Sequence, residues 1–144
     1  MDKKEYYSKF IEENKDKLKH MFDESITYTF DEFTNYLKDN NIGCRLLPFV
    51  NNYMLTSEGE VYFNDGNKFI KVIPWTFNDH TLYVSLMKNK DEFRIYSLPV
   101  LVISNFIYYN SYNGYNICKS KVIAYYDGDY RNCSLNNLYF YKFN

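Results

Sequence analysis

The sequence predicts an α+β fold in which two amino-terminal helices precede a domain made of β-hairpins. Near the amino terminus, apolar residues recur every three or four positions, which is typical of helices that bury one face. Beyond residue 44, short runs of β-branched and aromatic residues alternate with turns rich in Asn, Asp and Gly, which is typical of hairpins. At 144 residues and 46% hydrophobic content, the chain can form one core. We expect a helical appendage over residues 1–43 and an α+β domain over residues 44–144.

Two helices are expected in the appendage. The first spans residues 3–22 and carries an apolar stripe of Tyr7, Phe10, Ile11, Leu18, Met21 and Phe22. The second runs from Phe30 to about Asp39, because Thr29 and Glu32 form a capping box and Gly43 lies beyond its end. Two interpretations stay open: the helices only pack against the sheet, or they dock a partner or DNA.

Three hairpins and one helix are expected after residue 44. The helix has Pro99 in its first turn, where the missing N–H is harmless. The expected elements are strands 61–63 and 69–75, strands 82–87 and 93–96, the helix 99–108, a polar loop 110–116, and strands 122–125 and 138–141.

The segment from Val122 to Leu138, VIAYYDGDYRNCSLNNL, carries the most specific pattern in the chain. It resembles the catalytic hairpin of the HNH homing endonucleases, which reads roughly Val-x-His-x-Asp-Gly-Asn, then an Asn-Asn pair, then Asn-Leu. At the position of the general-base histidine stands Tyr125. The spacing of the family is reproduced by Asp127, Gly128, Asn132, Asn137 and Leu138.

The resemblance extends upstream and covers about residues 53 to 140. The run from Tyr53 to Val61, YMLTSEGEV, is similar to the Tyr-x-Val-Ser-x-x-Gly-x-Val module often found before these nuclease domains. The run from Arg94 to Leu98, RIYSL, stands where Arg-Val-His-Arg-Leu is usual, so Tyr96 replaces a second histidine. The resemblance implies a ββα-metal, HNH-like domain behind the two helices.

With tyrosine in place of both histidines, the hairpin lacks the general base that its chemistry needs. Phosphodiester hydrolysis requires a group that deprotonates water near neutral pH and a metal that stabilises charge on the phosphate. Histidine has a pKa of about 6.5 and tyrosine of about 10, so about one tyrosine in a thousand is ionised at pH 7, a handicap of about 4 kcal/mol. Only Arg131 lies near Tyr125 in sequence. We therefore expect no catalytic residue and regard these positions as vestigial: Tyr96, Tyr125, Asp127, Asn132 and Asn137.

The surviving motif residues also have a purely structural interpretation. Asp127-Gly128 is a strong turn signal in any β protein, and asparagines such as Asn132 readily cap turns. No metal site is expected, and at most a weak Mg²⁺ site would accompany retained cleavage. The only histidines, His20 and His80, lie outside the motif, and a site that recruits His80 with Asp79 or Asp127 is a minor alternative.

Charge and composition restrict the partners. The formal net charge is −1, whereas tight binding of duplex DNA usually needs a basic face. The 17 tyrosines and 12 phenylalanines suit protein contacts or stacking on unpaired bases, although an AT-rich coding genome, as in some bacteriophages, explains most of the excess. The candidate nucleic-acid contacts are Lys88, Lys90, Arg94, Lys119, Lys121 and Arg131.

The three cysteines form no C-x-x-C pair, which argues against a zinc knuckle or disulfide framework and favours a reducing interior. The sequence has no signal peptide and no apolar run of membrane-spanning length, so we expect the cytoplasm, that of the host if the protein is viral.

Three functional hypotheses follow. The leading one is a catalytically degenerate, phage-encoded HNH-like protein that binds DNA or a nucleic-acid-processing protein. The second is a live metal-dependent DNA endonuclease that uses Tyr125 or His80 as its base. The third is a protein-binding module, such as a phage inhibitor of a host enzyme or defence system, or a minor virion component.

Overall fold

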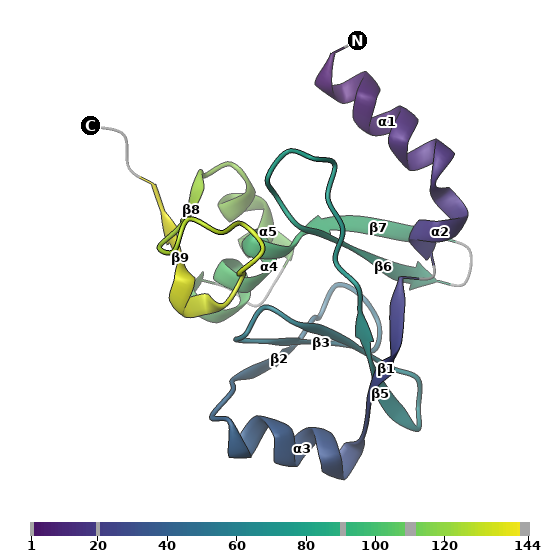
Figure 1. The fold of residues 1–144 in the computed structure, drawn as a ribbon, viewed down its shortest axis with the longest axis vertical. Coiled ribbons are helices and arrows are strands. Elements are labelled where there is room, and N and C mark those ends of the chain that lie inside the picture. Colours follow the sequence, from purple (N-terminus) through teal and green to yellow (C-terminus); the bar gives the residue numbers. More distant parts are fainter. Residues whose placement is uncertain (1, 20, 90–91, 109–111, 142–144) are drawn as a thin grey trace.

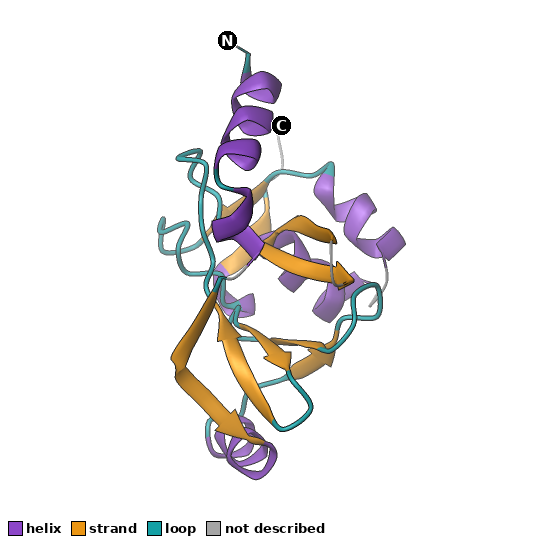
Figure 2. Ribbon diagram, turned by 90° about the vertical axis from the view of Figure 1, so that its right-hand side faces the viewer, coloured by secondary structure: helices purple, strands orange, loops and turns teal. Residues whose placement is uncertain are grey.

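The computed structural model describes residues 2–19, 21–89, 92–108 and 112–141 and has an α+β architecture (Figures 1 and 2). In chain order the elements are α1 (Lys3–Glu13), α2 (Lys15–Lys19), β1 (Phe22–Thr29), α3 (Phe30–Asp39), β2 (Cys44–Leu46), β3 (Tyr53–Thr56), β4 (Val61–Asn64), β5 (Lys68–Val72), β6 (Tyr83–Asn89), β7 (Glu92–Ser97), α4 (Leu98–Ile103), the π-helix η1 (Ser104–Tyr108), α5 (Tyr112–Lys119), β8 (Ile123–Tyr125), the 3-10 helix η2 (Leu135–Asn137) and β9 (Leu138–Phe140).

The first five strands form an antiparallel sheet in the order β1-β5-β4-β3-β2. Helix α3 lies at one end of the molecule against this sheet (Figure 1). Its buried Phe33 stacks on Phe69 of β5 at 4.3 Å between ring centroids and meets Tyr62 of β4 edge-on at 5.0 Å. The expected capping box is confirmed, because the Thr29 and Glu32 side chains each accept a hydrogen bond from the other's backbone N–H.

The second hairpin, β6–β7, leads directly into α4, and α4 provides much of the core. All six α4 residues are buried. The fully buried Tyr53 of β3 joins the sheet to this hairpin, since its hydroxyl accepts a hydrogen bond from the Met87 N–H at 2.9 Å. The expected strand pairs 61–63 with 69–75, 82–87 with 93–96, and 122–125 with 138–141 are thus confirmed in outline.

Two expectations in the amino-terminal region and the polar loop are wrong. The first helix does not continue to Phe22, since α1 and α2 end at Lys19 and Phe22 opens β1, where it pairs with Val72 of β5. A shift of register between Asp23 and Thr27 breaks the period-two alternation that would reveal this strand. The supposed polar loop 110–116 contains the start of α5, whose Tyr115 and Cys118 are buried three residues apart on one face.

The α+β class is confirmed, whereas the finer ββα-metal arrangement is not established. Within the described part of the chain no helix follows β9, and a five-stranded sheet is the largest element. The division into an appendage, 1–43, and an HNH-like domain, 44–144, stays a prediction, and β1 from the first segment completes the sheet of the second. No helix among the described residues is both long and apolar enough to span a membrane.

Candidate nucleic-acid interface

The motif residues Asp127, Asn132 and Asn137 come together in the loop between β8 and β9. The Asp127 carboxylate accepts hydrogen bonds from the Asn132 side-chain amide at 2.8 Å, the Asn137 side-chain amide at 2.9 Å and the Asp129 backbone N–H at 2.8 Å. The Asn137 amide oxygen accepts the Asp127 backbone N–H at 3.0 Å. These bonds, led by that from Asn132, lower the pKa of Asp127. The trio therefore holds the loop in shape, as the structural interpretation predicted.

Tyr125 is half-buried at the end of β8, beside the main core. Burial, followed by the nearby Cys133 and Asp79 side chains, raises the pKa of Tyr125. A phenol that already ionises rarely at neutral pH therefore ionises still more rarely here.

Tyr96 is not part of the same cluster. It is buried on β7, where its ring packs between Phe49 at 5.2 Å and Tyr115 at 5.4 Å between centroids. Tyr96 thus occupies an aromatic position in the core.

The Asp127 carboxylate and its asparagine partners are the oxygen donors that the hairpin loop would offer to the metal ion that HNH chemistry implies. Among the described residues, no three His, Cys, Asp or Glu side chains lie close enough together to hold an ion. Both oxygens of the Asp127 carboxylate already accept hydrogen bonds from the loop. His80 is exposed and meets the edge of the Tyr130 ring at 5.3 Å, and His20 lies outside the described residues.

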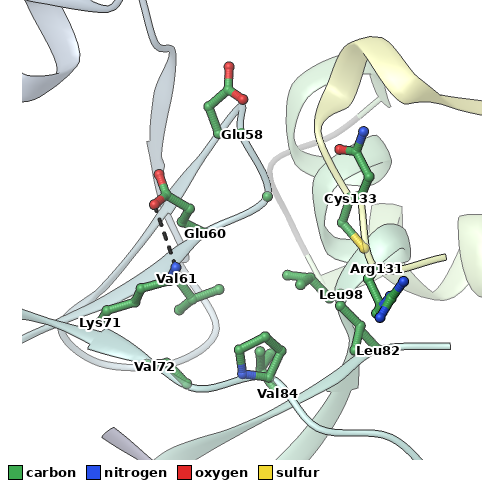
Figure 3. A pocket seen from close by; sticks show the side chains of 13 residues that line it. Glu58, Glu60, Val61, Lys71, Val72, Leu82, Val84, Leu98, Arg131 and Cys133 are labelled. Carbon is green, nitrogen blue, oxygen red and sulfur yellow. Dashed lines mark ion pairs between the residues drawn. The ribbon is translucent and has the colours of Figure 1, made fainter. Parts of the chain in front are cut away.

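The cavity beneath the hairpin loop is small and of mixed charge. Figure 3 shows Glu58 and Glu60 on one side of it and Arg131 and Cys133 on the other, with the ion pair between Lys71 and Glu60 at 3.9 Å. Its volume is about 160 Å³. With two carboxylates facing one arginine and one paired lysine, this cavity does not suit a polyanion.

A larger groove runs along the inner face of α1, and we call it the trough. It consists of two hollows of about 790 and 510 Å³ that share Ile11, Ile95, Tyr115 and Lys119. Helices α1 and α2 form one wall, β7 lies along the floor, and α5 and β8 form the other wall. Tyr125 and His80 both line its larger hollow.

The trough has a basic lining. Glu12 is the one acidic side chain among the described residues that line it. The basic residues that line it are all exposed: Lys3, Lys15, Arg94, Lys119 and Lys121. Three of the predicted contacts, Arg94, Lys119 and Lys121, are therefore brought together. The other predicted contacts are not, because Arg131 faces the small cavity and pairs with Asp129, Lys88 does not line the trough, and Lys90 lies outside the described residues.

A carboxylate–tyrosine cluster fixes α1 to one end of the trough. The Tyr7 and Tyr83 hydroxyls donate to one oxygen of the Asp79 carboxylate, at 2.5 and 2.7 Å. Burial alone would raise the pKa of Asp79, but the hydrogen bonds from Tyr7, Tyr83 and the nearby backbone together outweigh it and lower the pKa. The Tyr7 ring also stacks on Phe77 at 4.0 Å. Two of the tyrosines that line the trough are thus held in fixed orientations.

The fold is similar to that in a solved structure of DNA binding and cleavage by the HNH homing endonuclease I-HmuI. The TM-score is 0.52 at 18% sequence identity, over 69% of this chain and 52% of that chain. The fold is HNH-like. The chain spans about half the length of the I-HmuI chain. No protein-family model matches the sequence, and no curated protein does.

Within this HNH-like fold, sequence reasoning missed the contribution of α1. Lys3 and Lys15 belong to the trough, and so does the Asp79 cluster that anchors Tyr7. The apolar stripe of α1 gave a usable signal, because Tyr7, Phe10 and Ile11 do face the body of the protein and pack on Trp75, Phe77 and their neighbours. No local pattern indicates the surface on which α1 packs. The positions of Lys3 and Lys15 in the fold therefore cannot be predicted from the sequence.

Proposed function

We propose that this chain is a nucleic-acid-binding protein with an HNH-like fold that no longer cuts its ligand. The observation that carries the proposal is the trough, where five exposed basic side chains and one acidic side chain surround a groove that contains the Tyr125 position. Lys and Arg around a groove neutralise phosphates, which supplies most of the affinity of sequence-independent nucleic-acid binding. A net charge of −1 does not oppose this, because the local balance in the trough is five basic side chains to one acidic.

The absence of cutting follows from the hairpin itself. Tyr125 has a raised pKa, and both carboxylate oxygens of Asp127 accept hydrogen bonds from asparagines of the loop. A hydrolytic site needs both a base near neutral pH and a group that stabilises charge on the phosphate. The residues in these positions supply neither.

Binding is tested by the salt dependence of fluorescence anisotropy with a labelled oligonucleotide. The double variant Lys119→Glu/Lys121→Glu should weaken binding at least tenfold and reduce the slope of log K against log salt by about 2. The matched control is Lys38→Glu/Lys68→Glu, which makes the same charge change on exposed residues of α3 and β5, outside the trough. Equal losses in both double variants, or no binding by the unaltered protein, would refute the proposal.

A second candidate function, a live endonuclease, has one observation in its favour. His80 lines the same hollow as Tyr125 and contacts Tyr130 of the hairpin loop. If His80 served as the base, plasmid nicking with Mg²⁺ or Mn²⁺ would be lost in His80→Ala. The protein-binding alternatives, a phage inhibitor or a minor virion component, and the phage origin itself stay predictions.

A further inference from the structure

We propose that the trough takes an unpaired strand of DNA or RNA in preference to a duplex. This inference rests on the proposed function, because it names the class of nucleic acid that binds in the same trough. Three features of the trough lead to it, namely its shape, its aromatic lining and the placement of its charges.

The basic groups surround a hollow, whereas proteins that recognise duplex DNA insert a protruding helix or β-ribbon into a groove of the DNA. The major groove of B-DNA is about 12 Å wide and receives a helix or a β-ribbon from the protein. Here the reverse arrangement holds, since α1 and α2 form a wall and Lys3 of α1 and Lys15 of α2 border a concavity. The two hollows of about 790 and 510 Å³ have the size of small-ligand sites. A whole duplex is far too thick to enter them, whereas a single strand is not.

The trough is also lined by aromatic side chains. Tyr7, Tyr83, Phe93 and Tyr125 line it, and each is partly exposed. Bases in a duplex already stack on their neighbours, whereas an unpaired base can stack on a protein ring. The hydrogen bonds of Tyr7 and Tyr83 to Asp79 hold two of these rings before any ligand arrives. This lowers the entropy that ordering them would otherwise cost.

Positive charge lies along both walls of the trough. Lys3 lies on α1 and Lys15 on α2, whereas Lys119 and Lys121 lie on the opposite wall, at the end of α5 and just before β8. A phosphate backbone that runs between the walls would therefore have basic side chains on both sides.

The test compares three fluorescein-labelled probes of equal length in anisotropy titrations at one salt concentration. These are a 12-nucleotide DNA strand, the matching RNA strand and the 12-base-pair DNA duplex. Both single strands should bind at least tenfold more tightly than the duplex. A difference between the DNA and RNA strands would tell which sugar the trough prefers. Duplex binding as tight as strand binding would overturn the inference and leave the proposed function standing, whereas no binding of any probe would refute both.

Two adjacent tyrosines, at the last residue of β8 and just after it, provide the matched variants. Tyr125 lines the trough, whereas Tyr126 is 71% exposed and does not line it. Tyr125→Leu keeps most of the apolar packing but removes a stacking face, so strand affinity should fall about tenfold. Tyr126→Leu should leave it unchanged. If Tyr126→Leu weakened the strand complex and Tyr125→Leu did not, the ligand would lie on the outer face of the hairpin and the inference would fail.

A second variant, at exposed positions, tests the inference even if Tyr125→Leu misfolds. Lys119→Glu/Lys121→Glu changes surface residues alone. It should lower affinity for the single strands by a larger factor than for the duplex, because only the strands enter the trough. An equal factor for strands and duplex would contradict the inference, whatever the folding of the tyrosine variant.

Discussion

Gly59 lies directly against the backbone of Cys133, so that a β-carbon on Gly59 would stand 2.5 Å from the Cys133 carbonyl oxygen. Gly59 closes the β3–β4 turn with φ near +79°, and Cys133 belongs to the β8–β9 loop. The Leu135 N–H donates to the Ser57 carbonyl at 2.8 Å next to this contact. The upstream module and the last hairpin are therefore one packed unit, and the glycine of the module is the residue that permits their contact.

Replacing Gly59 with alanine should destabilise the protein by about 2–4 kcal/mol, because the methyl group adds a steric clash to the strain of a left-handed backbone. Urea unfolding measures the change. The matched control is Gly128→Ala, since Gly128 has φ near +73° and open space around its Cα. It should cost only about 1–2 kcal/mol. Equal losses would mean that the contact with Cys133 is unimportant.

Asn137 should contribute more to stability than its neighbour Asn136. The buried Asn137 side chain makes three hydrogen bonds, two with Asp127 and one to the Asn132 carbonyl at 2.9 Å. Asn137→Ala should lower the free energy of unfolding by about 2–3 kcal/mol, since it removes the hydrogen-bond partner of the Asp127 N–H and one of the three donors to the Asp127 carboxylate. Asn136 is exposed, so Asn136→Ala should change it by less than about 0.5 kcal/mol. A stable Asn137→Ala protein would show that the loop is held by other contacts.

The docking of α1 should weaken in acid. The pKa of Asp79 is lowered in the folded protein, so its contribution to stability is full above the ordinary value of about 3.9 and is lost as the pH falls through the lower folded value. The single tryptophan, Trp75, stacks on Phe10 of α1 at 5.7 Å, so its fluorescence reports the contact. We expect a change in Trp75 emission below about pH 4 in the native protein.

Tyr7→Phe should shift that transition to higher pH, because it removes one of the two hydroxyl donors to Asp79. It should also cost about 1–2 kcal/mol of stability at neutral pH. Tyr6→Phe is the control, since the Tyr6 hydroxyl makes only a 3.4 Å contact with the Phe77 carbonyl. An identical acid transition in native protein and Tyr7→Phe would show that Asp79 does not hold α1.

Restoring histidine at position 125 should not restore cutting. The described residues offer no group of three His, Cys, Asp or Glu side chains able to hold a metal, and Asp127 accepts hydrogen bonds from within the hairpin loop. Tyr125→His should therefore leave supercoiled plasmid intact with Mg²⁺ or Mn²⁺. Metal-dependent nicking by this variant would show that the tyrosine alone silenced the site.

The sequence predicted the local features and missed those that depend on tertiary contacts. The capping box at Thr29, the hairpins and the trio of Asp127, Asn132 and Asn137 follow from short-range patterns, and each is present. Strand β1 was missed because its register shift disrupts the alternation. Helix α5 was missed because its polar composition, YNGYNICK, hides a buried face made of Tyr115 and Cys118.

The candidate site was only partly predictable for the same reason. Arg94, Lys119 and Lys121 were named from sequence, but nothing local separates them from Arg131, which faces the small cavity instead. Lys3 of α1 and Lys15 of α2 join the trough through the packing of α1 on Trp75 and Phe77, a contact between segments more than 60 residues apart.

One native gel tests the claim that this HNH-like chain binds nucleic acid without cleaving it. Labelled single strand and supercoiled plasmid are incubated with the protein in Mg²⁺ or Mn²⁺, and the plasmid is then deproteinised and run beside the complexes. We predict a retarded strand and a plasmid that stays fully supercoiled. A nicked or linear plasmid whose formation disappears in His80→Ala, or an unretarded strand, would contradict the account.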